Sequence, residues 1–235
     1  MKPILLKTGR TFPELKARRG DYEDWFAAAL GWSVDQLELI DVTDVEAPLP
    51  EPGVDALIIT GSPASVHHRE PWSERAGAWV KAVVEAGVPT LGVCYGHQII
   101  GDVFGGEVGL NPNGREMGVV QMQRLVEDPI FEGLPSVFPV VETHTDAVNV
   151  APPGATVLAS TANTAVQAMA YGDHCRSVQW HPEFDADIIR HYIDARREMI
   201  DAEGGPGTAD AMLATVVDVD TGPIIMANFV RHWLK

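Results

Sequence analysis

The sequence predicts an α/β fold built on a mostly parallel β-sheet with an antiparallel or mixed extension. Through roughly the first 105 residues, short apolar stretches alternate with longer helical patterns, which is typical of parallel βαβ units. After Gly105-Gly106, short strand-like stretches follow one another between proline and glycine turns. No internal repeat or low-complexity linker interrupts the 235 residues. We therefore expect a single domain over 1–235 with a helical C-terminal extension over 185–235.

The N-terminal half begins with an apolar stretch over 4–6, which predicts the first strand. A helix is predicted over 21–30, where Gly31 ends it, and strands are predicted over 36–42 and 54–60. Further elements are a helix over 72–86, a buried strand over 89–93 and a helix over 95–104. The strand over 89–93 leads directly into the helix over 95–104.

The C-terminal half predicts five short strands and then a helical region. The strands are expected over 119–126, 137–141, 156–159, 165–171 and 176–180. A helix is expected over 185–201, after which E-G-G-P-G breaks the pattern before further helix ending near Trp233.

The composition excludes several classes of function. The chain has 17 Lys and Arg against 33 Asp and Glu, a formal charge of −16, which argues against binding to nucleic acid or to an anionic membrane surface. No stretch approaches the roughly 18 apolar residues of a membrane span, and the N-terminal run is too short for a signal peptide. Cys94 and Cys175 are therefore expected to be reduced thiols in the cytoplasm.

Cys94 stands at the end of an apolar strand, in G-V-C-Y-G-H-Q. Gly92 and Gly96 remove side chains where a sharp strand-to-helix turn brings backbone segments together. This pattern is the cysteine counterpart of the nucleophile elbow G-x-S-x-G. The thiol would meet the free N–H groups of a helix N-terminus, which favour the thiolate. The pattern predicts that Cys94 is a nucleophile.

A cysteine nucleophile needs a base, and the base needs an orienting acceptor. The segment Q-W-H-P-E-F offers His181 and Glu183, two positions apart at the end of a predicted strand, where both side chains point to one face. A helix N-terminus contributes about 0.3–1 kcal/mol, which leaves a thiol of ordinary pKa only partly ionised. An imidazolium supported by Glu183 would supply the rest and would protonate a departing amine.

An oxyanion formed in such a reaction needs backbone donors. One is expected to be the N–H of Tyr95, directly after the nucleophile. The second is expected from T-G-S-P, as the N–H of Gly61 or Ser62 after the strand ending at Thr60.

Together, G-V-C-Y-G-H-Q and H-P-E resemble the motifs of the class I glutamine amidotransferases, the Cys-His-Glu glutaminase domains. I-I-T-G-S, R-E-M-G and T-H-T-D are further points of resemblance, which covers about residues 54–184 and is strongest to the glutaminase portion of GMP synthetase and its stand-alone relatives. The resemblance implies a three-layer, flavodoxin-like fold and hydrolysis of glutamine to glutamate and ammonia through a thioester on Cys94. We expect no cofactor and no metal, because the spacings offer no second pair of metal ligands. The residues that it implies hold glutamine are Gln98, Thr143, His144, Thr145 and Asp146.

Three alternatives remain open from the sequence. No synthetase domain follows residue 184, so the ammonia acceptor would be a separate protein partner, or the enzyme would be a stand-alone hydrolase of γ-glutamyl compounds. A cysteine hydrolase of the DJ-1/PfpI type is disfavoured by Tyr95, because histidine commonly follows the nucleophile there. The third alternative is a regulatory module that retains the fold without turnover.

Overall fold

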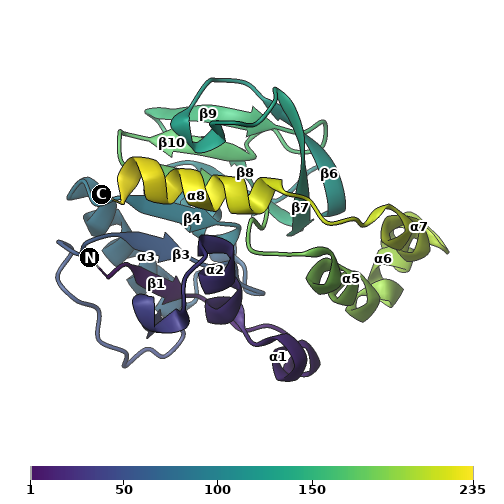
Figure 1. Ribbon diagram of the computed structural model, residues 1–235, viewed down its shortest axis with the longest axis horizontal. Helices are drawn as coiled ribbons and strands as arrows, with labels where there is room; N and C mark the ends of the chain where they lie inside the picture. The colour runs from purple at the N-terminus through teal and green to yellow at the C-terminus, as the bar shows by residue number, and fades with distance from the viewer. Residues whose placement is uncertain (1, 235) are drawn as a thin grey trace.

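A nine-stranded sheet forms the centre of the computed structural model, which describes residues 2–234 (Figure 1). Five neighbouring strands are parallel; in order across the sheet they are β2 (Glu38–Asp41), β1 (Ile4–Lys7), β3 (Leu57–Ile59), β4 (Thr90–Val93) and β11 (Cys175–Val178). Four antiparallel strands extend the sheet; in order they are β10 (Ala168–Tyr171), β9 (Ala155–Ser160), β6 (Glu116–Arg124) and β7 (Val137–His144). The predicted parallel sheet with an antiparallel extension is confirmed.

Helices cover both faces of the parallel strands, which gives three layers. On one face, Leu5, Ile58 and Leu91 stand side by side across β1, β3 and β4 and are fully buried. They belong to the same apolar cluster as α2 (Tyr22–Leu30) and α8 (Thr221–Trp233). The residues that alternate with them form a second cluster with α3 (Pro71–Glu85) and α4 (Tyr95–Val103). Burying each large apolar side chain contributes about 1.5–3 kcal/mol, so both layers stabilise the sheet.

Several strand boundaries differ from the predicted ones. Strand β6 starts at Glu116 and β7 extends to His144, whereas β11 already ends at Val178. A small second sheet pairs β5 (Glu107–Leu110) with β8 (Asp146–Val150), and the sequence analysis predicted neither strand. The segment T-H-T-D therefore spans the end of β7 and the start of β8.

The C-terminal helices do not form one continuous extension. The predicted helix over 185–201 is divided at Arg196 into α5 (Ala186–Ala195) and α6 (Arg197–Gly204), and α7 (Thr208–Thr215) follows. These three helices project beyond the antiparallel strands, whereas α8 lies along the sheet (Figure 1). Phe229 and Met226 of α8 are fully buried, so this helix belongs to the central layers.

Helix α1 (Pro13–Arg19) was not predicted; it follows β1 and starts with a proline at its first position.

Among residues 2–234, no helix has the length and apolar character needed to cross a membrane.

Candidate active site

Cys94 occupies the turn between β4 and α4, where its φ of 52° lies in the left-handed region. Such a φ is uncommon for a residue with a side chain and persists only where its surroundings enforce it. A Cβ on Gly92 would lie 2.5 Å from the Gly96 carbonyl oxygen, and one on Gly96 would lie 2.7 Å from the Ile59 carbonyl oxygen. The Cys94 amide donates to the Val178 carbonyl at 2.8 Å. The expected strand–turn–helix elbow is therefore present.

His181 and Glu183 pair just beyond β11, with 2.8 Å between Nδ1 and Oε1. Their exposed fractions are 5% and 6%, so the pair is buried. The pairing was predicted from the alternation of side chains along a strand, and that reason is wrong. Strand β11 ends at Val178, and the two side chains meet across a turn. The Phe184 ring stacks on the imidazole with 4.1 Å between centroids. The carboxylate accepts at Nδ1, so Nε2 is the nitrogen left for chemistry.

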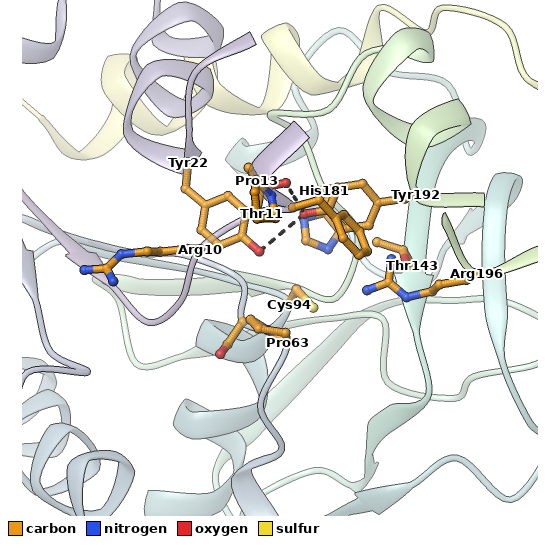
Figure 2. A pocket seen from close by; sticks show the side chains of 12 residues that line it. Arg10, Thr11, Pro13, Tyr22, Pro63, Cys94, Thr143, His181, Tyr192 and Arg196 are labelled. Atoms are coloured by element: carbon orange, nitrogen blue, oxygen red, sulfur yellow. Dashed lines mark hydrogen bonds between the residues drawn. The ribbon is translucent and has the colours of Figure 1, made fainter. Parts of the chain in front are cut away.

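The imidazole of His181 lies beside Cys94 (Figure 2). A Cβ on Gly61 would lie 2.8 Å from His181 Cε1 and 3.5 Å from Cys94 Cβ, so both side chains border one small space. Nε2 is buried and makes no hydrogen bond to a nitrogen or oxygen of the described residues. Burial alone would lower the pKa of His181, but the charge of Glu183 and then Cys94 raise it to about 10. A protonated imidazole at this place stabilises a negatively charged sulfur.

The loop after β3 is fixed from its buried side by two threonines. The hydroxyl groups of Thr8 and Thr60 donate to the Gly61 carbonyl oxygen at 2.8 and 2.9 Å. A trans peptide directs its C=O and N–H to opposite sides, so the Ser62 amide points away from Thr8. The Tyr95 amide belongs to the first turn of α4 and has no acceptor within that helix. Both amides belong to the predicted oxyanion donors.

The polar cavity, of about 230 Å³, opens on one side of Cys94 and includes every predicted substrate-binding residue. Those residues are Gln98, Thr143, His144, Thr145 and Asp146. The side-chain amide of Gln98 donates to the Asp146 carbonyl at 2.9 Å and to Gln179 Oε1 at 3.1 Å. Gln98 thus fixes the backbone of the wall, while the Asp146 carboxylate accepts a hydrogen bond from the Ser65 hydroxyl.

The aromatic cavity, of about 240 Å³, also borders Cys94 and was missed by sequence reasoning (Figure 2). Phe12, Tyr22 and Tyr192 line it, and the Thr11 hydroxyl lies 3.0 Å from the Tyr192 hydroxyl. The residues that line both cavities are Ser62, Pro63, Cys94, Thr143 and Arg196. One signal was available, because the loop after β1 leaves the carboxyl end of a parallel strand, where ligands bind in open α/β sheets.

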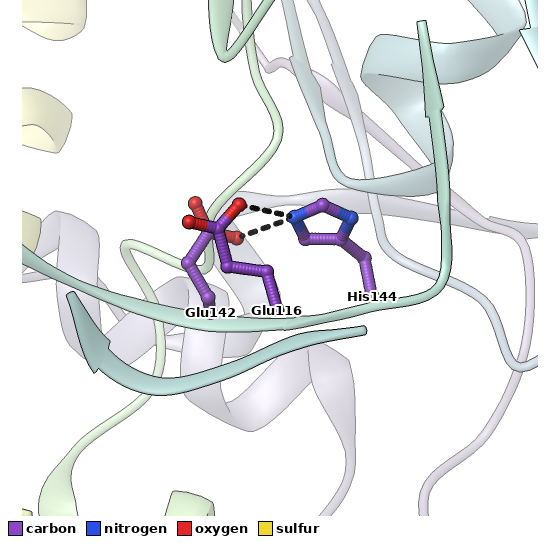
Figure 3. Close-up of side chains that lie close together, drawn as sticks. All are labelled: Glu116, Glu142 and His144. Carbon is purple, nitrogen blue, oxygen red and sulfur yellow. Dashed lines mark ion pairs between the residues drawn. The ribbon is translucent and has the colours of Figure 1, made fainter. Parts of the chain in front are cut away.

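His144 lines the polar cavity and lies beside two further buried ionisable side chains, Glu116 and Glu142 (Figure 3). Nε2 of His144 lies 3.5 Å from a carboxylate oxygen of Glu116 and 3.5 Å from one of Glu142, and Nδ1 donates to the Asp146 carbonyl at 2.9 Å. Burial, followed by the charge of Glu116, raises the pKa of Glu142 well above its usual range. The atoms of these three side chains that could bind a metal ion, one from each, lie within 4.8 Å of one another. His144 therefore turns its ring toward these carboxyl groups.

His97 and Cys175 occupy packed positions away from this chemistry. His97 bonds to the Ser177 hydroxyl at 2.9 Å and to the Val166 carbonyl at 3.1 Å, and burial lowers its pKa to about 3. Burial raises the pKa of Cys175 to about 12. Neither Cys175 nor Cys94 forms a disulfide.

Residues 27–193 match the family described as "Glutamine amidotransferase class-I". The chain belongs to this family. A glutamine amidotransferase from Thermotoga maritima shares its fold, with a TM-score of 0.75 and 17% identity over the whole of both chains.

Two kinds of curated relative match the chain. The "GMP synthase [glutamine-hydrolyzing]" of Thermomicrobium roseum is 42% identical over 142 residues, which cover 58% of this chain and 26% of that protein. "Gamma-glutamyl peptidase 3" of Arabidopsis thaliana is 28% identical over 231 residues, which cover 94% of this chain and 91% of that protein. The chain spans about a quarter to a third of the GMP synthases that it matches.

Proposed function

We propose that this protein hydrolyses the side-chain amide of glutamine to glutamate and ammonia through a thioester on Cys94. The single observation that carries the proposal is the buried Cys94, His181 and Glu183 arrangement between two cavities. A class I glutamine amidotransferase fold with these motifs supports it.

In the first half of the reaction, the Cys94 sulfur attacks the amide carbon and the carbonyl oxygen becomes an oxyanion. The Tyr95 amide and the amide of Ser62 or Gly61 would stabilise that charge. His181 gives its Nε2 proton to the amide nitrogen, the C–N bond breaks, and ammonia leaves. Glu183 keeps the imidazole aligned and stabilises its charged form.

In the second half, neutral His181 takes a proton from water, and the resulting hydroxide attacks the thioester carbon. The C–S bond then breaks, and glutamate and the Cys94 thiolate are released beside the protonated imidazole. We assign the polar cavity, with Gln98 and Thr143–Asp146 in its wall, to the glutamyl group.

A second candidate is hydrolysis of γ-glutamyl amides whose amine is larger than ammonia. Two observations favour it: the chain matches 91% of the length of Gamma-glutamyl peptidase 3, and the aromatic cavity offers about 240 Å³ of further space beside Cys94. If glutamine is the substrate instead, we infer that a separate synthetase receives the ammonia in the cytoplasm. A regulatory subunit without turnover is the remaining alternative.

The test compares wild type with Cys94→Ala, using Cys175→Ala as the matched cysteine control. Ammonia release from glutamine and amine release from γ-glutamyl peptides are measured separately, each with and without partners recovered from cell extract. We expect turnover of at least one substrate class by wild type and Cys175→Ala, and none by folded Cys94→Ala. Undiminished turnover by Cys94→Ala would refute the thioester mechanism.

A further inference from the structure

Arg196 lies at the break between α5 and α6 and reaches the site from the C-terminal helices. Its guanidinium carbon lies 4.9 Å from the ring centroid of Phe12 and 4.9 Å from that of Tyr192. Arg196 lines both the polar and the aromatic cavity, on the same side of Cys94 as Thr143 (Figure 2). Two aromatic faces therefore hold the guanidinium at the junction of the cavities.

No carboxylate of residues 2–234 pairs with Arg196, and its Nη1 is buried without a hydrogen-bond partner. Arg115, the other arginine of the polar cavity, is already paired: it contacts both oxygens of Glu203, at 2.8 and 3.0 Å. An arginine remains charged even when burial lowers its pKa, as burial does for Arg196. A half-buried guanidinium with a free donor is costly unless something anionic binds there.

The polar cavity carries opposite charges at separate places. Asp146 contributes a carboxylate to its wall, and Arg196 contributes the unpaired cation. The α-carbon of a γ-glutamyl group carries an ammonium and a carboxylate, so this charge pattern complements it. A planar guanidinium is also well shaped to bind a carboxylate through two parallel hydrogen bonds.

We propose that Arg196 binds the α-carboxylate of the γ-glutamyl substrate and makes that group a requirement for binding. This proposal rests on the proposed function, because it assumes that a γ-glutamyl group occupies the polar cavity. Arg196 is then a specificity-determining residue: it holds the end of the substrate remote from the reacting carbon, and the α-carboxamide of the same substrate should bind poorly.

Binding is measured by calorimetry on protein carrying Cys94→Ala, so the test does not need turnover. The ligands are glutamine and its α-carboxamide, which differ only in that an uncharged amide replaces the α-carboxylate. Arg196→Gln removes the positive charge, Arg196→Lys restores it, and Arg197→Gln is the matched control. Arg197 is the next residue, pairs with Asp194 and Asp210, and lines neither cavity.

We expect the protein to bind glutamine about 10- to 100-fold more tightly than the carboxamide, about 1.4–2.7 kcal/mol. Arg196→Gln should abolish this preference, Arg196→Lys should restore part of it, and Arg197→Gln should leave it unchanged. A preference that survives Arg196→Gln overturns the proposal, and so does a protein that binds neither ligand.

The carboxylate could also belong to the amine side of a γ-glutamyl peptide. Binding of γ-glutamylglycine and γ-glutamylmethylamine tests this, because both keep the α-carboxylate and only the first has a carboxylate on the amine. An Arg196→Gln effect confined to γ-glutamylglycine overturns the assignment to the α-carboxylate. Equal weakening of both supports it. Wild type that turns over no substrate, while the binding preference depends on Arg196, would refute the proposed function alone.

Discussion

Replacing Glu183 by glutamine tests the electrostatic basis of the proposed mechanism. The carboxylate lies 2.8 Å from His181 Nδ1, and both side chains are buried. With the two charge centres about 4 Å apart, the interaction is about 4 kcal/mol at an effective dielectric constant of about 20, or about 3 pKa units. Glu183→Gln keeps the shape of the side chain and removes its negative charge. The pKa of His181, about 10 in wild type, should therefore fall to about 7 or below.

The assay is the pH dependence of kcat/KM on whichever substrate wild type turns over. In the proposed mechanism protonated His181 is the acid, so activity should fall as pH rises through its pKa. The alkaline limb should move from about pH 10 to about pH 7 in Glu183→Gln, which lowers activity at pH 8 by about tenfold. Glu132→Gln is the control, since Glu132 pairs with His232 at 2.6 Å on the surface. Superimposable profiles for wild type and Glu183→Gln would show that Glu183 does not set the charge of His181.

Three further substitutions test the packing and charge around the site. Gly96→Ala should lower the free energy of unfolding by about 1–3 kcal/mol in urea titrations, because its Cβ would lie 2.7 Å from the Ile59 carbonyl oxygen. Gly61→Ala should lower kcat/KM by about 100-fold, since its Cβ would displace the His181 ring. Burial raises the pKa of Glu142, so wild type loses stability as pH rises from about 4.5 toward that pKa. In urea titrations at several pH values, Glu142→Gln should gain stability relative to wild type over that range.

The controls use positions of the same residue type in open surroundings. A Cβ on Gly109 would meet nothing within 4 Å, so Gly109→Ala should leave both stability and activity nearly unchanged. Glu38→Gln, at an exposed strand residue, is the matched substitution for Glu142→Gln. Equal losses for Gly96→Ala and Gly109→Ala would contradict the steric argument, as would a pH-independent effect of Glu142→Gln.

The sheet and the grouping of Cys94, His181 and Glu183 were predictable because local patterns specify them. Buried parallel strands appear in the sequence as short apolar runs. The glycines on either side of Cys94 mark the positions where β4 meets α4 and where α4 meets β3 too closely for a side chain. His181 and Glu183 were found by their spacing, although the stated reason was wrong, because a turn and not strand alternation brings them together.

The aromatic cavity could not be read from local pattern. Phe12 and Tyr192 come from opposite ends of the sequence, and although the loop after β1 is expected at the ligand-binding edge, no pattern in the sequence pairs it with Tyr192. Arg196 falls inside a continuous helical pattern, and only tertiary packing divides that helix and directs its side chain to the site. The burial of Glu142 was not predicted either, because it depends on strand β7 continuing to His144, beyond the predicted end of the strand at residue 141.

The hydrogen bond between Thr11 and Tyr192 joins two distant parts of the sequence across one wall of the site. During synthesis, a ribosome releases Cys94 long before His181, Glu183 and Tyr192 emerge. The nascent protein therefore carries a thiol without its activating partners. In the proposed mechanism, the Cys94 thiol becomes a strong nucleophile only when the segments made last dock, so a truncated or half-folded product should react slowly with electrophiles.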